Sequence, residues 1–138
     1  MRKYIGVLIF VASGFVLCSF HKTPSCDTIK NGRFHFYPTG SNGKHYIIDR
    51  KDSIQSEIDF KTYEMSVWNV NWLSDCVFYL NYKSGLSFKN DMERKAYENA
   101  LIKVSITKVT DQYFTYKSLL TMGSYKQEFN DTMWFKEK

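Results

Sequence analysis

The chain has little proline and lacks the short motifs of the common enzyme classes. Two prolines occur among 138 residues, which excludes a collagen-like or proline-rich low-complexity chain. Hydrophobic residues make up 43% and charged residues 24%, a balance typical of globular proteins and not of disordered ones. This length is sufficient for one domain with its own core and leaves little for a second.

The missing motifs also limit the chemistry. The sequence contains no nucleophile elbow, His-Glu-x-x-His, Walker loop or Cys-x-x-Cys. The histidines His21, His35 and His45 are scattered and do not combine with the cysteines at metal-ligand spacing. His35 and His45 flank a predicted hairpin and could face each other, for which we favour a structural role. We therefore predict no catalytic residue, no metal and no cofactor.

The N-terminus has the three-part layout of a secretory signal peptide. Arg2 and Lys3 precede an apolar run over residues 4–17, and polarity returns at His21. The run is shorter than the roughly 20 apolar residues that a membrane-spanning helix needs. We expect residues 1–19 to be a signal peptide, residues 20–31 a short polar lead-in and residues 32–138 a single β domain.

Cys18 raises the alternative of a lipoprotein signal that ends just before this residue. A lipidated Cys follows the apolar run in such signals, but a small residue ordinarily precedes it, and here the neighbour is Leu17. Two lipid chains would hold the protein on a membrane, whereas cleavage after Cys18 or Ser19 would release it. Both routes predict an exported protein, either periplasmic or anchored as a membrane lipoprotein.

The net charge is weak evidence for a polyanionic partner. The chain carries 19 basic and 14 acidic residues, a formal charge of +5. Removal of Arg2 and Lys3 leaves 17 basic and 14 acidic residues, or +3, with the two signs interspersed. Export also separates the protein from cytoplasmic nucleic acid, so we expect no nucleic-acid partner and membrane contact only through a lipid anchor.

The cysteine count predicts a disulfide. Processing removes or acylates Cys18, which leaves Cys26 and Cys76 as an even pair in an oxidising compartment. The alternative is two separately buried thiols.

Most of residues 32–138 alternates between apolar and polar side chains, as β-strands do. Asn42-Gly43 is a strong hairpin signal, and other short turns recur every 8–12 residues. Asn90, with Glu93 three residues later, fits a capping box and predicts one helix over residues 92–100. The strands are expected over residues 32–37, 44–50, 53–60, 64–73, 76–83, 101–107, 113–120 and 125–135, the last with a kink at Asn130-Asp131.

The fold class that follows is all-β: an antiparallel up-and-down meander of about eight strands, with the helix before the sixth. Such a meander forms a barrel or a strongly curved sheet. On residues 53–60, Gln55, Glu57 and Asp59 fall on one face, and Ile54, Ile58 and Phe60 fall on the other. We expect this polar face and that of residues 101–107, which carries Lys103, to point outward. The charges of Glu57, Asp59 and Lys103 then disfavour a membrane-spanning barrel, because lipid would cover them.

Aromatic residues make up 17% of the chain, and several fall on predicted inward faces. They are expected to fill the core of the barrel, or else to line a cavity for one small apolar ligand. The candidate interior residues are Phe34, Phe36, Trp68, Trp72, Phe78, Tyr82, Phe114 and Tyr116.

Cys26, the Gly32-Arg33-Phe34 step and the segment from Trp68 through Trp72 to Cys76 resemble a family of small, uncharacterised exported proteins of Gram-negative bacteria. Some members of that family carry an inherited "DNA topoisomerase IV" name. This chain contradicts that activity, because it has no Gly-rich phosphate loop and no room for a nucleotide-binding domain.

A looser resemblance is to lipocalin-like barrels, which open with Gly-x-Trp on the first strand. This chain has Gly32-x-Phe34 there, and its helix precedes the sixth strand instead of following the barrel. We expect a non-catalytic binding or interaction module of the cell envelope with an unknown partner protein. The alternatives are a carrier of a small apolar ligand in a lipocalin-like barrel and a small hydrolase-like enzyme whose residues converge only in three dimensions.

Overall fold

The computed structural model of the chain describes residues 25–40 and 42–138. The predicted signal peptide, the lipidation candidate Cys18 and the first part of the lead-in therefore lie outside the described residues.

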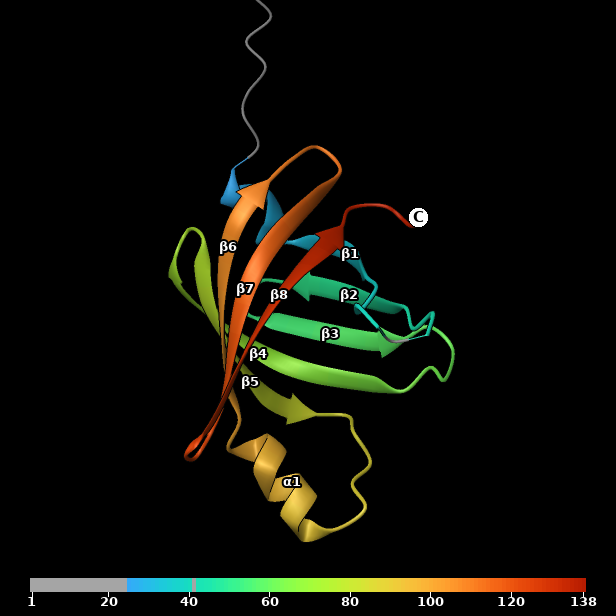
Figure 1. Ribbon diagram of the computed structural model, residues 1–138, viewed down its shortest axis with the longest axis vertical. Coiled ribbons are helices and arrows are strands. Elements are labelled where there is room, and N and C mark those ends of the chain that lie inside the picture. Colours follow the sequence, from blue (N-terminus) through green and yellow to red (C-terminus); the bar gives the residue numbers. More distant parts are fainter. Residues whose placement is uncertain (1–24, 41) are drawn as a thin grey trace, which may run out of the picture.

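Within this range, eight antiparallel strands form one closed barrel, in which each strand pairs with its neighbours in sequence and β8 returns to β1 (Figure 1). This confirms the predicted all-β up-and-down meander. The strands are β1 (Gly32–Phe36), β2 (Tyr46–Lys51), β3 (Ile54–Asp59), β4 (Met65–Ser74), β5 (Val77–Ser84), β6 (Leu101–Val109), β7 (Tyr113–Met122) and β8 (Tyr125–Trp134).

The described residues also form two short helices, which lie at opposite ends of the barrel (Figure 1). The 3-10 helix η1 (Cys26–Ile29) precedes β1, and the α-helix α1 (Asp91–Glu98) lies between β5 and β6, as predicted. The Asn90 side chain accepts a hydrogen bond from the Glu93 backbone N–H at 2.9 Å. The Glu93 carboxylate in turn accepts from the Lys89 N–H at 2.7 Å. This reciprocal cap starts α1 close to the predicted position.

Short turns set the register between neighbouring strands. Asn42 and Gly43 both have positive φ, 46° and 78°, as the predicted β1–β2 hairpin requires. The pairing of β7 with β8 runs without a shift from Tyr113↔Trp134 to Met122↔Tyr125. The ladder therefore continues through Asn130 and Asp131, where a kink was expected.

The barrel closes through a short seam. β1 pairs with β8 at only two positions, His35↔Trp134 and Phe36↔Met133. Among the described residues, the remainder of β8 therefore pairs with β7 alone. The two strands separate beyond Phe36, which leaves the rest of β8 as a free edge.

The polar face of β3 points inward, so the expectation that it points outward was wrong. Gln55 is 1% exposed and, with Glu57, lines the barrel interior, whereas Ile54 and Ile58 lie on the outer face. Gln55 pairs with Trp68 of β4 in the register. Since side chains on paired residues share a face of the sheet, the inward direction of Trp68 also fixes that of Gln55.

Candidate functional site

The interior of the barrel holds a cavity of about 500 Å³, here called the inner cavity. Residues from every strand except β4 line it. Cavities of this size hold single small molecules in many proteins. Its apolar wall is made by Phe36, Ile48, Phe78, Leu80, Ile102, Val104, Phe114, Phe129 and Met133.

The predicted aromatic set does not fill this space. Phe36, Phe78, Phe114 and Tyr116 line the inner cavity, but the other four candidates lie elsewhere. Small or polar side chains, such as Gln55 and Ser118, occupy several other inward positions, and no aromatic ring fills the space beside them. Among the other four, Phe34 is buried in the core, Trp72 packs against that core, Trp68 lines a second cavity, and Tyr82 contacts Tyr97 of α1.

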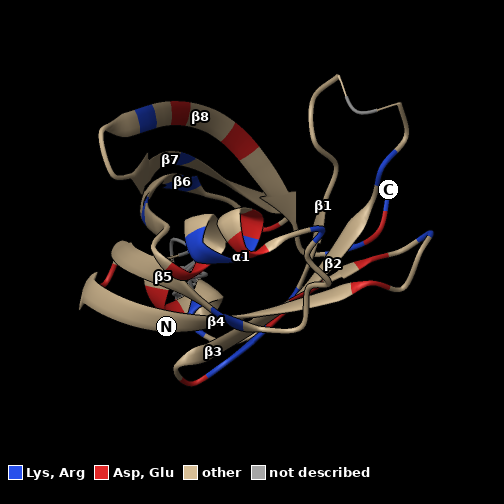
Figure 2. Cartoon of the chain, turned by 90° about the horizontal axis from the view of Figure 1, so that it is seen from below, with Lys and Arg blue, Asp and Glu red and all other residues tan. Residues whose placement is uncertain are grey.

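The second, outer cavity has a volume of about 1070 Å³ and shares Phe36, Pro38, Glu57 and Phe129 with the inner one. Tyr97 of α1 contributes to its wall. Viewed from the α1 side, the helix lies across the ring of strands (Figure 2). Because the two cavities share four lining residues, we take the outer cavity as the mouth of the interior. Besides Glu57, four charged residues of mixed sign line the outer cavity: Lys44, Asp59, Lys61 and Glu64.

Arg50 is the buried cation of the interior, with 2% of its surface exposed. Its Nε and Nη2 groups donate to Gln55 Oε1 at 2.8 and 2.6 Å, and Nη1 donates to the Ile29 carbonyl at 2.8 Å. The guanidinium lies 4.5 Å from the centre of the Phe78 ring, within range of a cation–π interaction. Burial lowers the pKa of Arg50 to about 10, so the group stays charged at neutral pH.

Glu57 is connected to Arg50 through Gln55, whose Nε2 donates to Glu57 Oε1 at 2.8 Å. Burial raises the pKa of Glu57, and the Gln55 hydrogen bond and the charge of Arg50 oppose that rise without cancelling it. The chain Arg50–Gln55–Glu57 runs along one wall of the inner cavity, and Glu57 also borders the outer cavity.

Tyr116 and Asp131 face the same cavity. Burial raises the pKa of Asp131, opposed by a hydrogen bond from the Thr132 backbone N–H. The Tyr116 side chain is buried and its pKa is raised by burial and by the charges of Asp131 and Glu57. In the described part of the chain, the Tyr116 hydroxyl makes no hydrogen bond.

Sequence reasoning missed Arg50, Gln55, Glu57 and Asp131 as interior residues. The alternation of Gln55, Glu57 and Asp59 was visible in the sequence, but it does not show which face is inside. Arg50 and Asp131 stand in strands where a charged residue on its own resembles a surface position.

The two histidines face each other, as predicted, but outside both cavities. His35 Nδ1 and His45 Nε2 are 3.0 Å apart, and the Tyr37 ring stacks on His45 at 4.5 Å. Burial lowers the pKa of His35, and the neighbouring His45 lowers it further. Neither ring lines the inner or the outer cavity. The pair thus belongs to the packing of the outer surface around β1.

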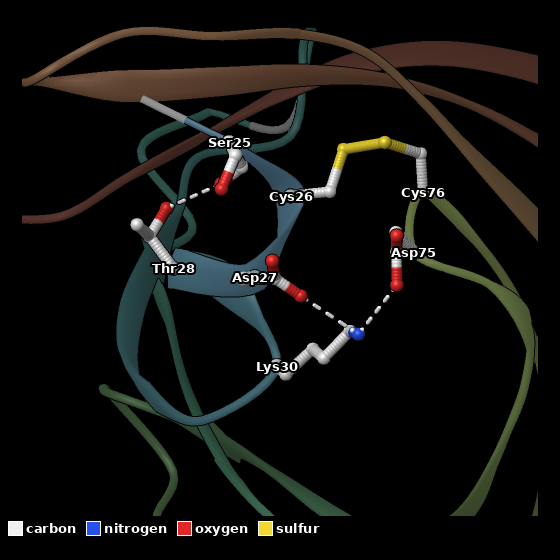
Figure 3. The surroundings of a disulfide bond; sticks show 7 residues. All are labelled: Ser25, Cys26, Asp27, Thr28, Lys30, Asp75 and Cys76. Carbon is white, nitrogen blue, oxygen red and sulfur yellow. Dashed lines mark hydrogen bonds and ion pairs between the residues drawn. A yellow bond between two sulfur atoms is a disulfide. The ribbon is translucent and has the colours of Figure 1, made fainter. Parts of the chain in front are cut away.

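The predicted Cys26–Cys76 disulfide is present (Figure 3) and holds η1 at the end of the barrel opposite α1 (Figure 1). It ties η1 to the β4–β5 turn, where the two Cα atoms are 5.2 Å apart. Lys30 Nζ lies 2.8 Å from carboxylate oxygens of both Asp27 and Asp75, beside the disulfide (Figure 3). This end also carries the Ile29 carbonyl, so the disulfide holds one acceptor of Arg50 in place.

Among residues 25–40 and 42–138, no group of three or more His, Cys, Asp or Glu side chains is placed to hold a metal ion. The same residues contain no helix with the length and apolarity needed to cross a membrane. Comparisons with protein families, curated proteins and solved structures find no significant match to this chain. The two resemblances noted in the sequence therefore stay predictions. The functional proposal below is based on the cavity.

Proposed function

We propose that the protein is a non-catalytic binding protein of the cell envelope that holds one small, largely apolar ligand inside the barrel. The inner cavity of about 500 Å³ carries this proposal, because a protein that only presents its surface has no need of an interior space. The disulfide supports export, since such bonds persist in oxidising compartments.

The seam between β1 and β8 supports a route for the ligand. Pro38 and Thr39 follow β1, Phe129 and Asn130 belong to β8, and all four line the inner cavity. Only two residue pairs join the two strands, so few hydrogen bonds oppose their separation at this seam. A ligand can therefore enter beside Phe129, which borders both cavities.

The test uses N-phenyl-1-naphthylamine, an uncharged apolar dye whose fluorescence rises in a dry pocket. Purified protein with its disulfide intact should bind it with one-to-one stoichiometry. Ser118→Trp fills the inner cavity, and Lys117→Trp adds the same ring at the exposed position next to it. The first variant should lose about tenfold or more in dye affinity, and the second should bind as the parent does. Equal binding by both variants, each with a parental melting curve, contradicts an interior site.

A second candidate is the interaction module that the sequence favours. Exposed apolar side chains at the turn between β3 and β4 support it. Phe60, Tyr63 and Met65 are 46%, 75% and 43% exposed, which is high for large apolar side chains close in sequence. A photo-crosslinking amino acid at Tyr63 should give an adduct of one defined mass in cells, and one at Asn81 on another wall should not. Neither cavity contains the histidine pair, so no observation favours the hydrolase alternative.

A further inference from the structure

Among residues 25–40 and 42–138, two carboxyl groups face the inner cavity, and neither forms an ion pair with a cation there. Glu57 accepts one side-chain hydrogen bond, from Gln55, and Asp131 accepts one from the Thr132 backbone N–H. Removal from water destabilises an ionised carboxylate unless donors or a cation replace the lost hydration. The raised pKa values of both groups express that deficit.

Arg50 does not fill this gap. Three of its N–H groups donate to Gln55 and to the Ile29 carbonyl, and its flat face lies over Phe78. No ion pair joins it to Glu57 or Asp131 within the described residues. Its positive charge acts on Glu57 only across Gln55.

An independent observation marks a polar position at the same place. The Tyr116 side chain is 7% exposed and lines the inner cavity, yet its hydroxyl has no hydrogen-bond partner in the described part of the chain. Tyr116 is the register partner of Asp131 across the β7–β8 ladder, so the two side chains lie on the same face, and Glu57 lines the same cavity. Among the described residues, no fully buried side-chain nitrogen or oxygen lacks a partner, so the unpaired Tyr116 hydroxyl is open to the space of the cavity, where a polar group of a ligand can bond to it.

We infer that the ligand is an organic amine, protonated at neutral pH, whose ammonium group binds Glu57 and Asp131 beside the Tyr116 hydroxyl while its apolar body fills the rest of the cavity. This inference rests on the proposed function. An ammonium group has only donors, which match two carboxylates and a hydroxyl oxygen. A fatty carboxylate would instead face two groups of its own charge, and the buried guanidinium that could offset them already has partners.

The experiment compares three probes with the same ten-carbon chain: decylamine, decan-1-ol and decanoate. Each displaces N-phenyl-1-naphthylamine from the protein at about pH 7.5. Decylamine should bind about tenfold or more tightly than decanol, as charge-assisted hydrogen bonds predict, and decanoate should bind most weakly. The shared chain length keeps the apolar contribution nearly constant.

Isosteric variants assign the preference to the two carboxyl groups. Glu57→Gln and Asp131→Asn should each lower the affinity for decylamine about tenfold and change that for decanol by less than about twofold. Glu128→Gln removes an exposed carboxylate of β8 and should change neither. If one interior variant fails to fold, as its melting curve would show, the other still carries the test.

The outcomes distinguish failure of the amine inference from failure of the proposed function. Decanol or decanoate binding as tightly as decylamine overturns the amine inference and leaves the interior site intact. Decylamine affinity that survives both interior variants also overturns it. Failure of the dye and of all three probes to bind overturns the proposed function itself.

Discussion

Arg50 and Glu57 are joined through one side chain, that of Gln55, which accepts two hydrogen bonds from the guanidinium and donates one to the carboxylate. An amide is suited to this place because its oxygen accepts and its nitrogen donates. The arrangement keeps a charged guanidinium inside the barrel and leaves the Glu57 carboxylate facing the cavity.

Gln55→Ala should destabilise the protein by about 2–4 kcal/mol. The substitution leaves two N–H groups of Arg50 and one oxygen of Glu57 without partners in the interior. Buried charged groups without partners lower the free energy of unfolding. Urea unfolding followed by tryptophan fluorescence measures the change. Gln112→Ala, at an exposed position, should alter stability by no more than about 0.5 kcal/mol. A loss below about 1 kcal/mol at Gln55 would show that water or another group replaces the amide.

Glu57→Gln should stabilise the protein at neutral pH and have no such effect in acid. Because the folded-state pKa of Glu57 is raised, its contribution to stability is fully present below the ordinary Glu pKa and is lost as pH rises through the folded value. The variant keeps the hydrogen bond to Gln55 without the buried charge. Its melting temperature should exceed the parent's by about 2–6 °C at pH 7 and match it near about pH 4. A constant difference across this range would contradict the assigned titration.

The disulfide should contribute about 3–4 kcal/mol, because it closes a long loop in the unfolded chain. Cys26 and Cys76 are separated by 50 positions. Reduction should lower the free energy of unfolding measured in urea, and the double change Cys26→Ser and Cys76→Ser should lower it by the same amount. Reductant should have no effect on the double variant. Peptide mass spectrometry without reductant should recover the linked pair. Free alkylation of both thiols in protein recovered from the cell envelope would rule the bond out there.

Processing at the N-terminus is expected before Cys18 or Phe20. Intact mass of the protein from cells should lack the preceding residues. Palmitate labelling and sensitivity to globomycin distinguish lipidation at Cys18 from simple cleavage. Cys18→Ser should release a lipidated protein from the membrane, and membrane attachment that persists in this variant would exclude the lipoprotein route.

Much of the architecture could be predicted from local pattern. Alternation with a period of two locates the strands β1 to β8 without any knowledge of which strands pair. The short turns between them permit only antiparallel pairing of sequence neighbours, which gives a meander. The cap at Asn90 and Glu93 is equally local. The disulfide followed from the cysteine count once Cys18 was set aside.

The candidate site could not be predicted in the same way. Alternation assigns Gln55 and Glu57 to one face and Ile54 and Ile58 to the other, but it is symmetric with respect to which face is buried. Pairing with Trp68 on β4 breaks that symmetry. The polar wall of the cavity is therefore a consequence of barrel closure.

The chain's residue order is thus sufficient for the strands, the turns, the helix cap and the disulfide pairing, since each depends on neighbours in sequence or on a count. The cavity, the buried Arg50 and the grouping of Glu57, Tyr116 and Asp131 come from β2, β3, β7 and β8, which meet only when the barrel closes. Their burial and raised pKa values arise from exclusion of water by residues distant in sequence. No local pattern carries that information.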